Sequence, residues 1–459
     1  MKTPVLDKNF YPMIKALSDF EKELEKHGES VQITFVLERT GGYNYVYTYN
    51  SLPDGVNDEL NFRVAERLVK MILWTVGGFK LSVNGSKAVY GYLKQTYSLQ
   101  GARSKDVAYM GLYYDIPFSV VWIEKDGIPE QKNANIKIGG YLDGCRIGFD
   151  AGGSDRKVSA VIDGKVVYSE EVVWNPKTTA DPHYHYDGIL TAMKTAASKM
   201  PTVDAIGVSS AGVCVENKMM DAALFMKVDK EKYGDFVKNI YINAVKEMEK
   251  EYGKDIPFAL ANDGDVTALA GAIDLRDNGV LGIAMGTSEA VGYINTQGGI
   301  NGWLSELASA PVDFNENAVL DEFSGDIGVG CKYFSQDAVI KLAEAGGHTF
   351  ADELTPAQKL KEVQAMMEKD EPLAKQIYKD IGVYLAHTIP FYAKFYDIKH
   401  MLLLGRVMGG KGGDTILASC KEVLAEEYPQ FATLDIGLPD EKNRRVGQSI
   451  AAASLPKCK

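Results

Sequence analysis

The sequence predicts an α/β protein in which one local pattern occurs twice: a strand that ends in a glycine-and-hydroxyl turn and continues as a second strand. The first copy spans residues 147–174 and turns at residues 152–154. The second copy spans residues 280–303 and turns at residues 286–288. Helical periodicity follows each copy, and strands that alternate with helices are typical of layered α/β domains. The repeat therefore predicts two lobes of similar architecture.

Residues 1–140 are predicted to form an α/β extension before the two lobes. Residues 31–50 alternate apolar and polar side chains around a Gly-Gly turn, as a β-hairpin does. In residues 59–74 apolar side chains recur every four residues, which places them on one face of a helix. Acidic and basic residues are nearly balanced here, so we expect no basic face for binding DNA. The pattern assigns no function to this extension.

The composition narrows the class of protein. A net charge of −12 argues against a general grip on nucleic acid or on an anionic membrane surface. The five cysteines form no Cys-x-x-Cys pair, so neither a disulfide framework nor a four-thiolate zinc site is expected. His183 and His185, which stand among tyrosines, are interpreted as part of a polar loop and not as metal ligands. Without an apolar leader or an apolar run of about 18 residues, the chain is expected to be cytoplasmic.

The two glycine-rich turns are candidate phosphate-binding loops. Glycines leave backbone N–H groups uncovered, so those groups can approach phosphate oxygens, and Ser154 and Thr287 add hydroxyl donors. Asp150 ends the strand before the first turn, where a carboxylate could hold Mg²⁺ through its waters. The alternative for each turn alone is a tight β-turn with a capping side chain. The occurrence of two such turns favours phosphate binding.

Residues 261–271 supply a candidate for the chemistry. Asn262 and Asp263 stand where a buried strand ends and a helix begins. One interpretation is a helix cap, because Asn and Asp satisfy free N–H groups at that position. The other makes Asp263 a general base that accepts a hydroxyl proton during phosphoryl transfer. Asp265 is an alternative for either role. Residues 402–414 add a strand, a glycine-rich turn and a helix, an arrangement common at nucleotide contacts.

The order of these segments resembles the sugar kinase/actin/Hsp70 superfamily and, within it, the ROK family of sugar kinases and repressors. The resemblance covers residues from about 145 to 459. It implies an α/β, two-lobed, duplicated ribonuclease-H-like (actin-like ATPase) fold behind the N-terminal α/β extension. The lobes are expected at residues 141–272 and 273–440, and a C-terminal helix within residues 441–459 is expected to pack back on the first lobe.

The resemblance also implies roles for individual residues. Asp263 would be the general base, Asn262 and Glu306 would bind sugar hydroxyls, and Asp150 would hold Mg²⁺ through water. Of the glycines in residues 402–414, the pair at 409 and 410 would face the adenosine. The residues implied for ATP and its phosphates are Asp150, Gly152, Gly153, Ser154, Gly286, Thr287, Gly409 and Gly410.

The sequence departs from the family pattern around the sugar and zinc positions. In the Glu-x-Gly-His stretch of typical ROK kinases, Glu306 matches the Glu but Ser309 stands where His is expected. Of the zinc cluster only Cys331 remains, Asp326 replaces the first cysteine, and Tyr333 replaces a family glutamate. One cysteine cannot hold a thiolate zinc site, so no structural zinc is expected. These changes leave the identity of the sugar open.

Together these features predict a cytoplasmic, ATP-dependent sugar kinase that uses ATP and Mg²⁺. The γ-phosphoryl group would pass to a hydroxyl of a hexose or related sugar, with Asp263 as base. The expected partners are the small-molecule sugar and ATP, with neither nucleic acid nor membrane, and a homodimer is allowed. Two alternatives stay open: a non-catalytic ROK-like sugar sensor or regulator, and an ATPase with a non-sugar acceptor.

Overall fold

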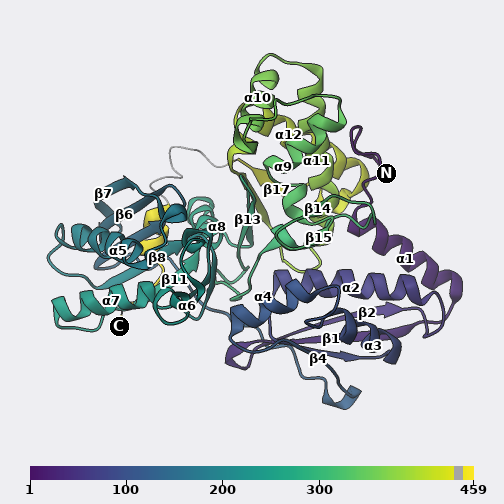
Figure 1. Cartoon of the computed structure of the whole chain (residues 1–459), viewed down its shortest axis with the longest axis horizontal. Coiled ribbons are helices and arrows are strands. Elements are labelled where there is room, and N and C mark those ends of the chain that lie inside the picture. The colour runs from purple at the N-terminus through teal and green to yellow at the C-terminus, as the bar shows by residue number, and fades with distance from the viewer. Residues whose placement is uncertain (439–447, 459) are drawn as a thin grey trace. The chain divides into compact units, whose positions relative to one another are not determined.

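The computed structural model describes residues 1–438 and 448–458, which fall into two compact units (Figure 1). Unit 1 comprises Met1–Ala134, Ile283–Val291 and Trp303–Leu438, and so joins the N-terminal extension to most of the predicted second lobe. Unit 2 comprises Asn135–Gly282, Gly292–Gly302 and the described part of the C-terminus. The α/β fold class predicted from the sequence is confirmed. Among the described residues, no helix is long and apolar enough to cross a membrane.

Unit 2 is built on a five-stranded sheet with parallel and antiparallel parts. Its order is β11 (Phe258–Asn262), β8 (Ala205–Ser210), β5 (Cys145–Ala151), β6 (Asp155–Ile162) and β7 (Lys165–Val173). The neighbours β11, β8 and β5 run parallel, whereas β5, β6 and β7 are antiparallel. All residues of β5 and β8 are buried, as expected for parallel strands covered on both faces. In β7, half-buried and exposed residues alternate.

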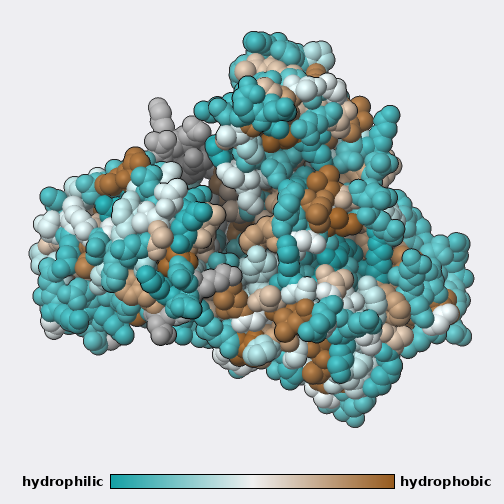
Figure 2. Space-filling view, viewed as in Figure 1, coloured by the Kyte–Doolittle hydropathy of each residue, from teal (hydrophilic) through white to brown (hydrophobic). Residues whose placement is uncertain are grey.

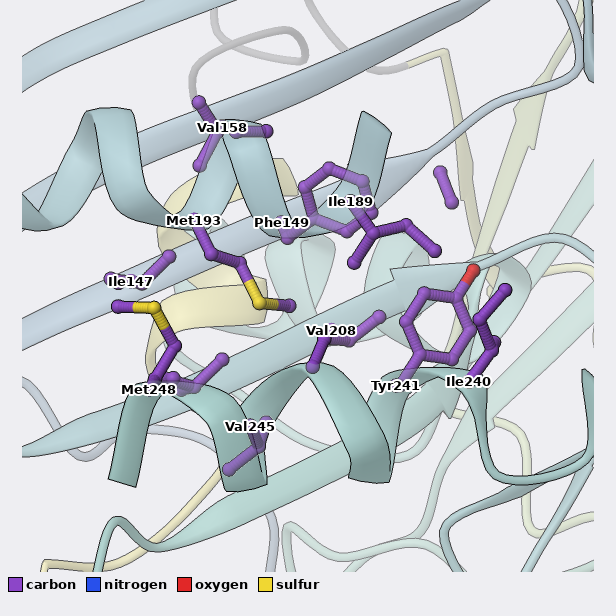
Figure 3. Packing of buried hydrophobic residues seen from close by; sticks show 14 of the residues in the cluster. Ile147, Phe149, Val158, Ile189, Met193, Val208, Ile240, Tyr241, Val245 and Met248 are labelled. Atoms are coloured by element: carbon purple, nitrogen blue, oxygen red, sulfur yellow. The ribbon is translucent and has the colours of Figure 1, made fainter. Parts of the chain in front are cut away.

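Helices cover the central strands of this sheet. On one side α5 (Pro182–Ala197) and α7 (Ile240–Tyr252) enclose an apolar core, in which Met193 of α5 and Met248 of α7 belong to the same buried cluster as Ile147 of β5 (Figure 3). The helical residues 448–453 lie against the same strands. A Cβ atom at Gly148 would lie 2.0 Å from the carbonyl oxygen of Ser449, so only glycine allows this approach. Unit 2 also contains the hairpin of β9 (Val213–Val215) and β10 (Lys218–Asp221), the short α6 (Lys230–Lys232), and α8 (Asp263–Leu275).

The N-terminal part of unit 1 is a four-stranded sheet covered by helices. The strand order is β2 (Asn44–Ser51), β1 (Val31–Glu38), β3 (Lys80–Asn84) and β4 (Ser119–Trp122). Its helices are α1 (Met13–His27), α2 (Asp58–Thr75), α3 (Lys87–Thr96) and α4 (Ser104–Tyr114) (Figure 1). Thirteen of the eighteen residues of α2 are buried, including Glu66, Arg67 and Lys70. A helix that packs on the sheet alone would keep a polar outer face, so α2 is covered on more than one side.

The rest of unit 1 carries most of a second sheet and a helical layer. The sheet order is β13 (Glu289–Ile294), β12 (Val280–Met285), β16 (His400–Leu404) and β17 (Asp435–Gly437). The helices are α9 (Gln336–Ala345), α10 (Pro356–Glu368), α11 (Pro372–Tyr392) and α12 (Gly410–Glu427). The short hairpin of β14 (Leu320–Asp321) and β15 (Asp326–Ile327) precedes α9. On the face shown in Figure 2, apolar side chains form scattered patches on a mostly hydrophilic surface.

The prediction of a polar loop at His183 and His185 is wrong. Both residues lie in α5, which begins at Pro182 because the Asp181 side chain accepts a hydrogen bond from the His183 amide. His185 is fully buried, and its Nε2 lies 3.0 Å from the carbonyl oxygens of Pro176 and Leu224. It is therefore a core histidine whose ring joins two loops to the helix.

Candidate active site

In unit 2 the candidate site lies at the carboxyl ends of the parallel strands. Asp150, near the end of β5, is aligned with Ser209 of β8, and Ser209 is aligned with Ala261 of β11. Neighbouring strands are about 4.8 Å apart, so Asp150 and the end of β11 are separated by two strand spacings, about 10 Å. Asp263 follows β11 directly and is the first residue of α8. The fold thus gathers the two predicted carboxylates at one sheet edge.

Asp150 is held by its neighbouring strand. It is 8% exposed, and its Oδ1 accepts a 2.7 Å hydrogen bond from the Ser209 hydroxyl. Burial raises the pKa of Asp150, and the bond from Ser209 acts in the opposite direction. A carboxylate is a ligand that Mg²⁺ accepts, and Mg²⁺ generally uses one or two protein carboxylates with waters and phosphates. Asp150 fits that role, although no group of three or more His, Cys, Asp or Glu residues that could hold a metal occurs in the described ranges.

The first glycine turn is tied to the end of β7. The indole Nε1 of Trp174 donates to the Gly152 carbonyl (2.8 Å), and its amide donates to the Ser154 carbonyl (3.1 Å). The Ser154 hydroxyl donates to Asp155 Oδ2 (3.0 Å). A Cβ atom at Gly153 would lie 2.8 Å from Nζ of Lys177, so an ammonium group stands beside the turn. Lys177 was not expected from the sequence, because it follows no motif and only folding brings it here.

Asn262 is the N-cap of α8. Its Oδ1 accepts from the Gly264 amide (2.7 Å) and its Nδ2 donates to the Gly212 carbonyl (2.8 Å). The helix-cap interpretation therefore describes Asn262 in this structure. An amide oxygen and an amide nitrogen can each form a second hydrogen bond, so capping does not use the full capacity of the side chain.

Asp263 and Asp265 share the first turn of α8 but have different environments. Burial, followed by the charge of Asp150, raises the pKa of Asp263 to about 6. Burial raises the pKa of Asp265 to about 7, and its Oδ1 accepts a 3.1 Å hydrogen bond from the Tyr293 amide. Asp265 is therefore committed to the backbone of β13. The charge of Asp150 acts on Asp263, whereas Asp265 is held by the Tyr293 amide, and this difference favours Asp263 as the reactive carboxylate.

In unit 1 the second turn connects β12 to β13. The Gly286 amide donates to the Ser288 carbonyl (2.9 Å), and the Gln336 amide donates to the Gly286 carbonyl (2.9 Å). Thr287 is exposed, and its hydroxyl oxygen accepts a hydrogen bond from the guanidinium of Arg406. A guanidinium is a strong donor to phosphate. Arg406 was missed, although it lies in the glycine-rich segment that the sequence analysis selected.

Gly409 and Gly410 lie at the start of α12. Gly409 is its N-cap and Gly410, its first residue, has a φ of +59°; both are exposed. The next residue, Lys411, is held by Asp370 at 2.8 Å. Because a glycine cap has no side chain, the first amides of this 18-residue helix are not covered by one. The turn therefore exposes backbone amides that no capping side chain covers.

Glu306 lies in a segment that packs against other parts of unit 1. The preceding Trp303 packs edge-on against Tyr45, with ring centroids 5.5 Å apart, and also contacts Tyr396. Ser309, at the position where the resemblance implies His, is 4% exposed. Glu306 itself is only partly buried, which leaves its carboxylate within reach of a ligand.

The positions of the family zinc cluster have other partners here. Tyr333 donates from its hydroxyl to Asp313 (2.7 Å). Asp326 forms ion pairs with Arg67 (2.9 Å) and Lys70 (3.5 Å), and with Arg103. Cys331 is buried, and burial raises the pKa of its thiol. An aspartate that is saturated by three cations is not available to a metal ion.

Glu289 is an acidic residue that the sequence analysis missed. It is the first residue of β13 and is 4% exposed, and no residue of the described chain hydrogen-bonds to either of its carboxylate oxygens. Burial, followed by the charge of Glu306, raises the pKa of Glu289 to about 8. The alternating apolar pattern after the glycine turn could have flagged it, because a charged residue there points into the core.

Solved structures of ROK proteins are similar to this chain. The ROK hexokinase of Thermus thermophilus is 14% identical, with a TM-score of 0.49 over 67% of this chain and 97% of its own. A ROK glucokinase of Streptomyces griseus, in complex with glucose and AMPPNP, is 17% identical, with a TM-score of 0.47 over 67% and 98%. A ROK transcriptional regulator, a homolog of the E. coli MLC protein, is 16% identical, with a TM-score of 0.52 over 68% and 78%. The fold of this chain is the ROK fold.

The likeness to the ROK regulator confirms the ROK-like α/β fold expected from the sequence. No protein-family model and no curated protein matches the sequence. The likeness therefore concerns the fold alone.

Proposed function

We propose that this protein is an ATP-dependent kinase that transfers the γ-phosphoryl group of ATP to a hydroxyl of a hexose or related sugar. The observation that carries the proposal is the position of Asp150 and Asp263 at the carboxyl ends of parallel strands of the unit 2 sheet. Burial and the Asp150 charge raise the pKa of Asp263 to about 6. A base of this pKa is mostly ionised at pH 7 yet binds a proton more strongly than an ordinary aspartate does.

In the proposed reaction Asp263 accepts the proton of the sugar hydroxyl as its oxygen attacks the γ-phosphorus. A bond forms between that oxygen and phosphorus, and the bond between phosphorus and the β,γ-bridging oxygen breaks, releasing ADP. Mg²⁺, held through water by Asp150, would offset charge on the phosphates. The amides of Gly152 and Gly153 and the ammonium of Lys177 would contact phosphate oxygens on the side of unit 2.

The remaining residues proposed to bind ATP and the sugar lie in unit 1 and at the N-cap of α8. Gly286 and Thr287, with Arg406 beside the threonine hydroxyl, would form the second phosphate contact. Gly409 and Gly410 would face the adenosine. Glu306 and Asn262 would hold sugar hydroxyls, because a ring with several hydroxyls must be fixed at more than one to direct a single oxygen.

The decisive experiment is ATP turnover with the purified protein across hexoses, N-acetylhexosamines and other monosaccharides, together with a control without sugar. A kinase gives ADP and sugar phosphate in equal amounts with at least one sugar. If ADP forms equally fast without any acceptor, the protein is an ATPase and the sugar kinase proposal is wrong.

A non-catalytic sugar sensor is the second candidate. Two observations favour it: the structural likeness to a ROK transcriptional regulator and the serine at position 309. A sensor would bind a sugar in calorimetry without turning over ATP. It would also tolerate Asp263→Asn without any change in sugar affinity, because a sensor has no use for a base.

A further inference from the structure

The end of helix α2, in the N-terminal extension, holds the backbone next to Glu306. The amide of Leu304 donates to the carbonyl of Val76 (3.3 Å), that of Ser305 to Thr75 (2.9 Å), and that of Glu306 to Trp74 (2.9 Å). The last carbonyls of a helix lack partners within the helix and need donors from elsewhere. Three consecutive amides of residues 304–306 supply them. The direction of this segment is thus set by the end of α2.

The backbone held in this way is strained. Ser305 has a φ of +51°, a left-handed conformation that non-glycine residues rarely adopt. The Tyr396 hydroxyl lies 3.3 Å from the Ser305 hydroxyl and adds a second anchor. Such a conformation persists only where the surroundings determine it, and strain of this kind concentrates at functional sites. Here the surroundings are the carbonyls of α2, one residue before the predicted sugar-binding glutamate.

The contact between the end of α2 and residues 304–306 leaves no room for a side chain at Gly77. Gly77, which follows α2, has a φ of +76°, and a Cβ atom there would lie 2.5 Å from Cγ of Leu304 and 2.2 Å from the hydroxyl of Tyr114. A larger residue at position 77 would therefore displace the 304–306 segment. From the sheet of the extension, Tyr45 packs against Trp303.

A second set of contacts fixes the hairpin beyond Glu306 to the same helix. Asp326 is 2% exposed and is paired with Arg67 and Lys70 of α2. Glu66 and Asp106 balance the charges of these cations within the extension: Arg67 Nε lies 2.7 Å from Glu66, and Lys70 Nζ lies 2.6 Å from Asp106. Removing one member of such a buried set leaves an uncompensated charge. Residues 303–327 are thus attached to α2 at both ends.

We propose that residues 1–134 are a positioning element of the acceptor site: the end of α2 fixes the backbone of residues 304–306 and thereby the placement of the Glu306 carboxylate. This inference rests on the kinase function proposed above. Glu306 would contact the acceptor, whereas α2 acts through it. Loss of the contact between α2 and residues 304–306 should lower the affinity for the acceptor and leave the affinity for ATP unchanged.

The test uses Gly77→Ala in the full chain, with Gly55→Ala as the matched control. Gly55 also has a positive φ (+86°) and lies in the extension, but no atom stands within 4 Å of its added Cβ. For Gly77→Ala we expect faster amide hydrogen exchange at residues 304–306. We also expect an acceptor KM raised by about tenfold or more, because small misplacements of a binding group are costly. The KM for ATP should stay within about twofold. Gly55→Ala should change none of these quantities.

If Gly77→Ala does not fold, Tyr45→Leu replaces it, because this change loosens the packing on Trp303 without burying a charge or filling space. Faster exchange at residues 304–306 with an unchanged acceptor KM would overturn the proposal, as would an equal effect of Gly55→Ala. If the wild type transfers no phosphoryl group, the kinase function fails. The affinity for the best-binding sugar, measured by calorimetry without ATP, then replaces KM. If no sugar binds at all, both proposals are wrong.

Discussion

The carboxylate of Asp150 raises the pKa of Asp263 through its charge, in addition to the larger effect of burial. The two side chains lie at the carboxyl ends of the outer strands of the parallel set β5–β8–β11: Asp150 is near the end of β5, Asp263 directly follows β11, and Ser209 is on the strand between them. Because like charges disfavour each other's ionisation, a cation placed at Asp150 would lower the pKa of Asp263. The protonation state of Asp263 thus depends on whether a cation is bound at Asp150.

Asp263→Asn should abolish phosphoryl transfer, with a loss of about 10²–10⁴-fold in kcat, because the base is needed only as the hydroxyl attacks. The affinity for ATP, measured by calorimetry, should remain nearly that of the wild type. The Asn side chain can still occupy the start of α8. Near-wild-type turnover in this variant would leave Asp263 only a structural role in the first turn of α8.

The pH dependence of the wild type should have an acid limb near pH 6. The pKa of Asp263 is raised to about 6, so the base is ionised above that pH and protonated below it. The value of kcat/KM for MgATP reports the enzyme before Mg²⁺ binds beside Asp150, so it should fall by about tenfold for each pH unit below roughly pH 6. A profile measured from pH 4.5 to 8 checks this. A limb near pH 4, the range of an ordinary aspartate, would mean that another group is the base.

Glu306→Gln should raise the KM for the acceptor, lower kcat, or both, while the KM for ATP changes little. The substitution keeps the shape of the side chain but removes the charge that binds a sugar hydroxyl. Initial rates with either substrate varied in turn separate the two KM values. An equal effect on both would show that Glu306 acts on the fold of unit 1 and not on the acceptor.

Glu289→Gln should stabilise the protein at alkaline pH. The pKa of Glu289 is raised from 4.5 to about 8, so the folded state binds more protons than the unfolded state between these values. The free energy of unfolding of the wild type therefore decreases as pH rises through this window. Gln cannot ionise, so the Tm advantage of the variant should be large at pH 8.5 and small near pH 5. A Tm difference that does not vary with pH would contradict this assignment.

Elemental analysis of the purified protein should find no stoichiometric structural zinc. Asp326 stands at the position of the first cysteine in the family cluster, and Arg67, Lys70 and Arg103 neutralise it. Near-stoichiometric zinc would mean that Cys331 has metal-binding partners that this arrangement does not show.

Arg67→Met should destabilise the fold by about 3–5 kcal/mol, because it leaves a buried carboxylate short of a partner.

The sequence was informative where local pattern determines local structure. The strands ending at Asp150 and Asn262, the turns at residues 152–154 and 286–288, and the cap of α8 all depend on neighbouring residues, and the chain order of these segments indicated the fold. Sequence reasoning failed where a partner lies far along the chain. Lys177 and Arg406 reach the two turns only through tertiary packing, and the cations that surround Asp326 come from the extension.

The buried carboxyl of Glu289 was missed for a different reason. It shares a strand face with Val291 and Tyr293, so the two-residue period could have placed it in the core, but a carboxyl at the start of a strand is usually exposed. His185 is the converse case: a residue that looked like part of a polar loop proved to be a fully buried core residue, because Asp181 and Pro182 start a helix before it.

Unit 1 is assembled from segments that are far apart in the chain, and this affects how the protein can be shortened. A chain beginning at residue 135 would lose α1 and α2, and with them the partners of Asp326, of Leu304–Glu306 and of the apolar face of α11 that contacts α1. Such a fragment would present a bare apolar surface and a buried acid without a counter-charge, a combination that favours aggregation. Genetic deletion of the first 134 residues should therefore yield insoluble protein and not a minimal kinase. The extension and the rest of unit 1 therefore form one folding unit.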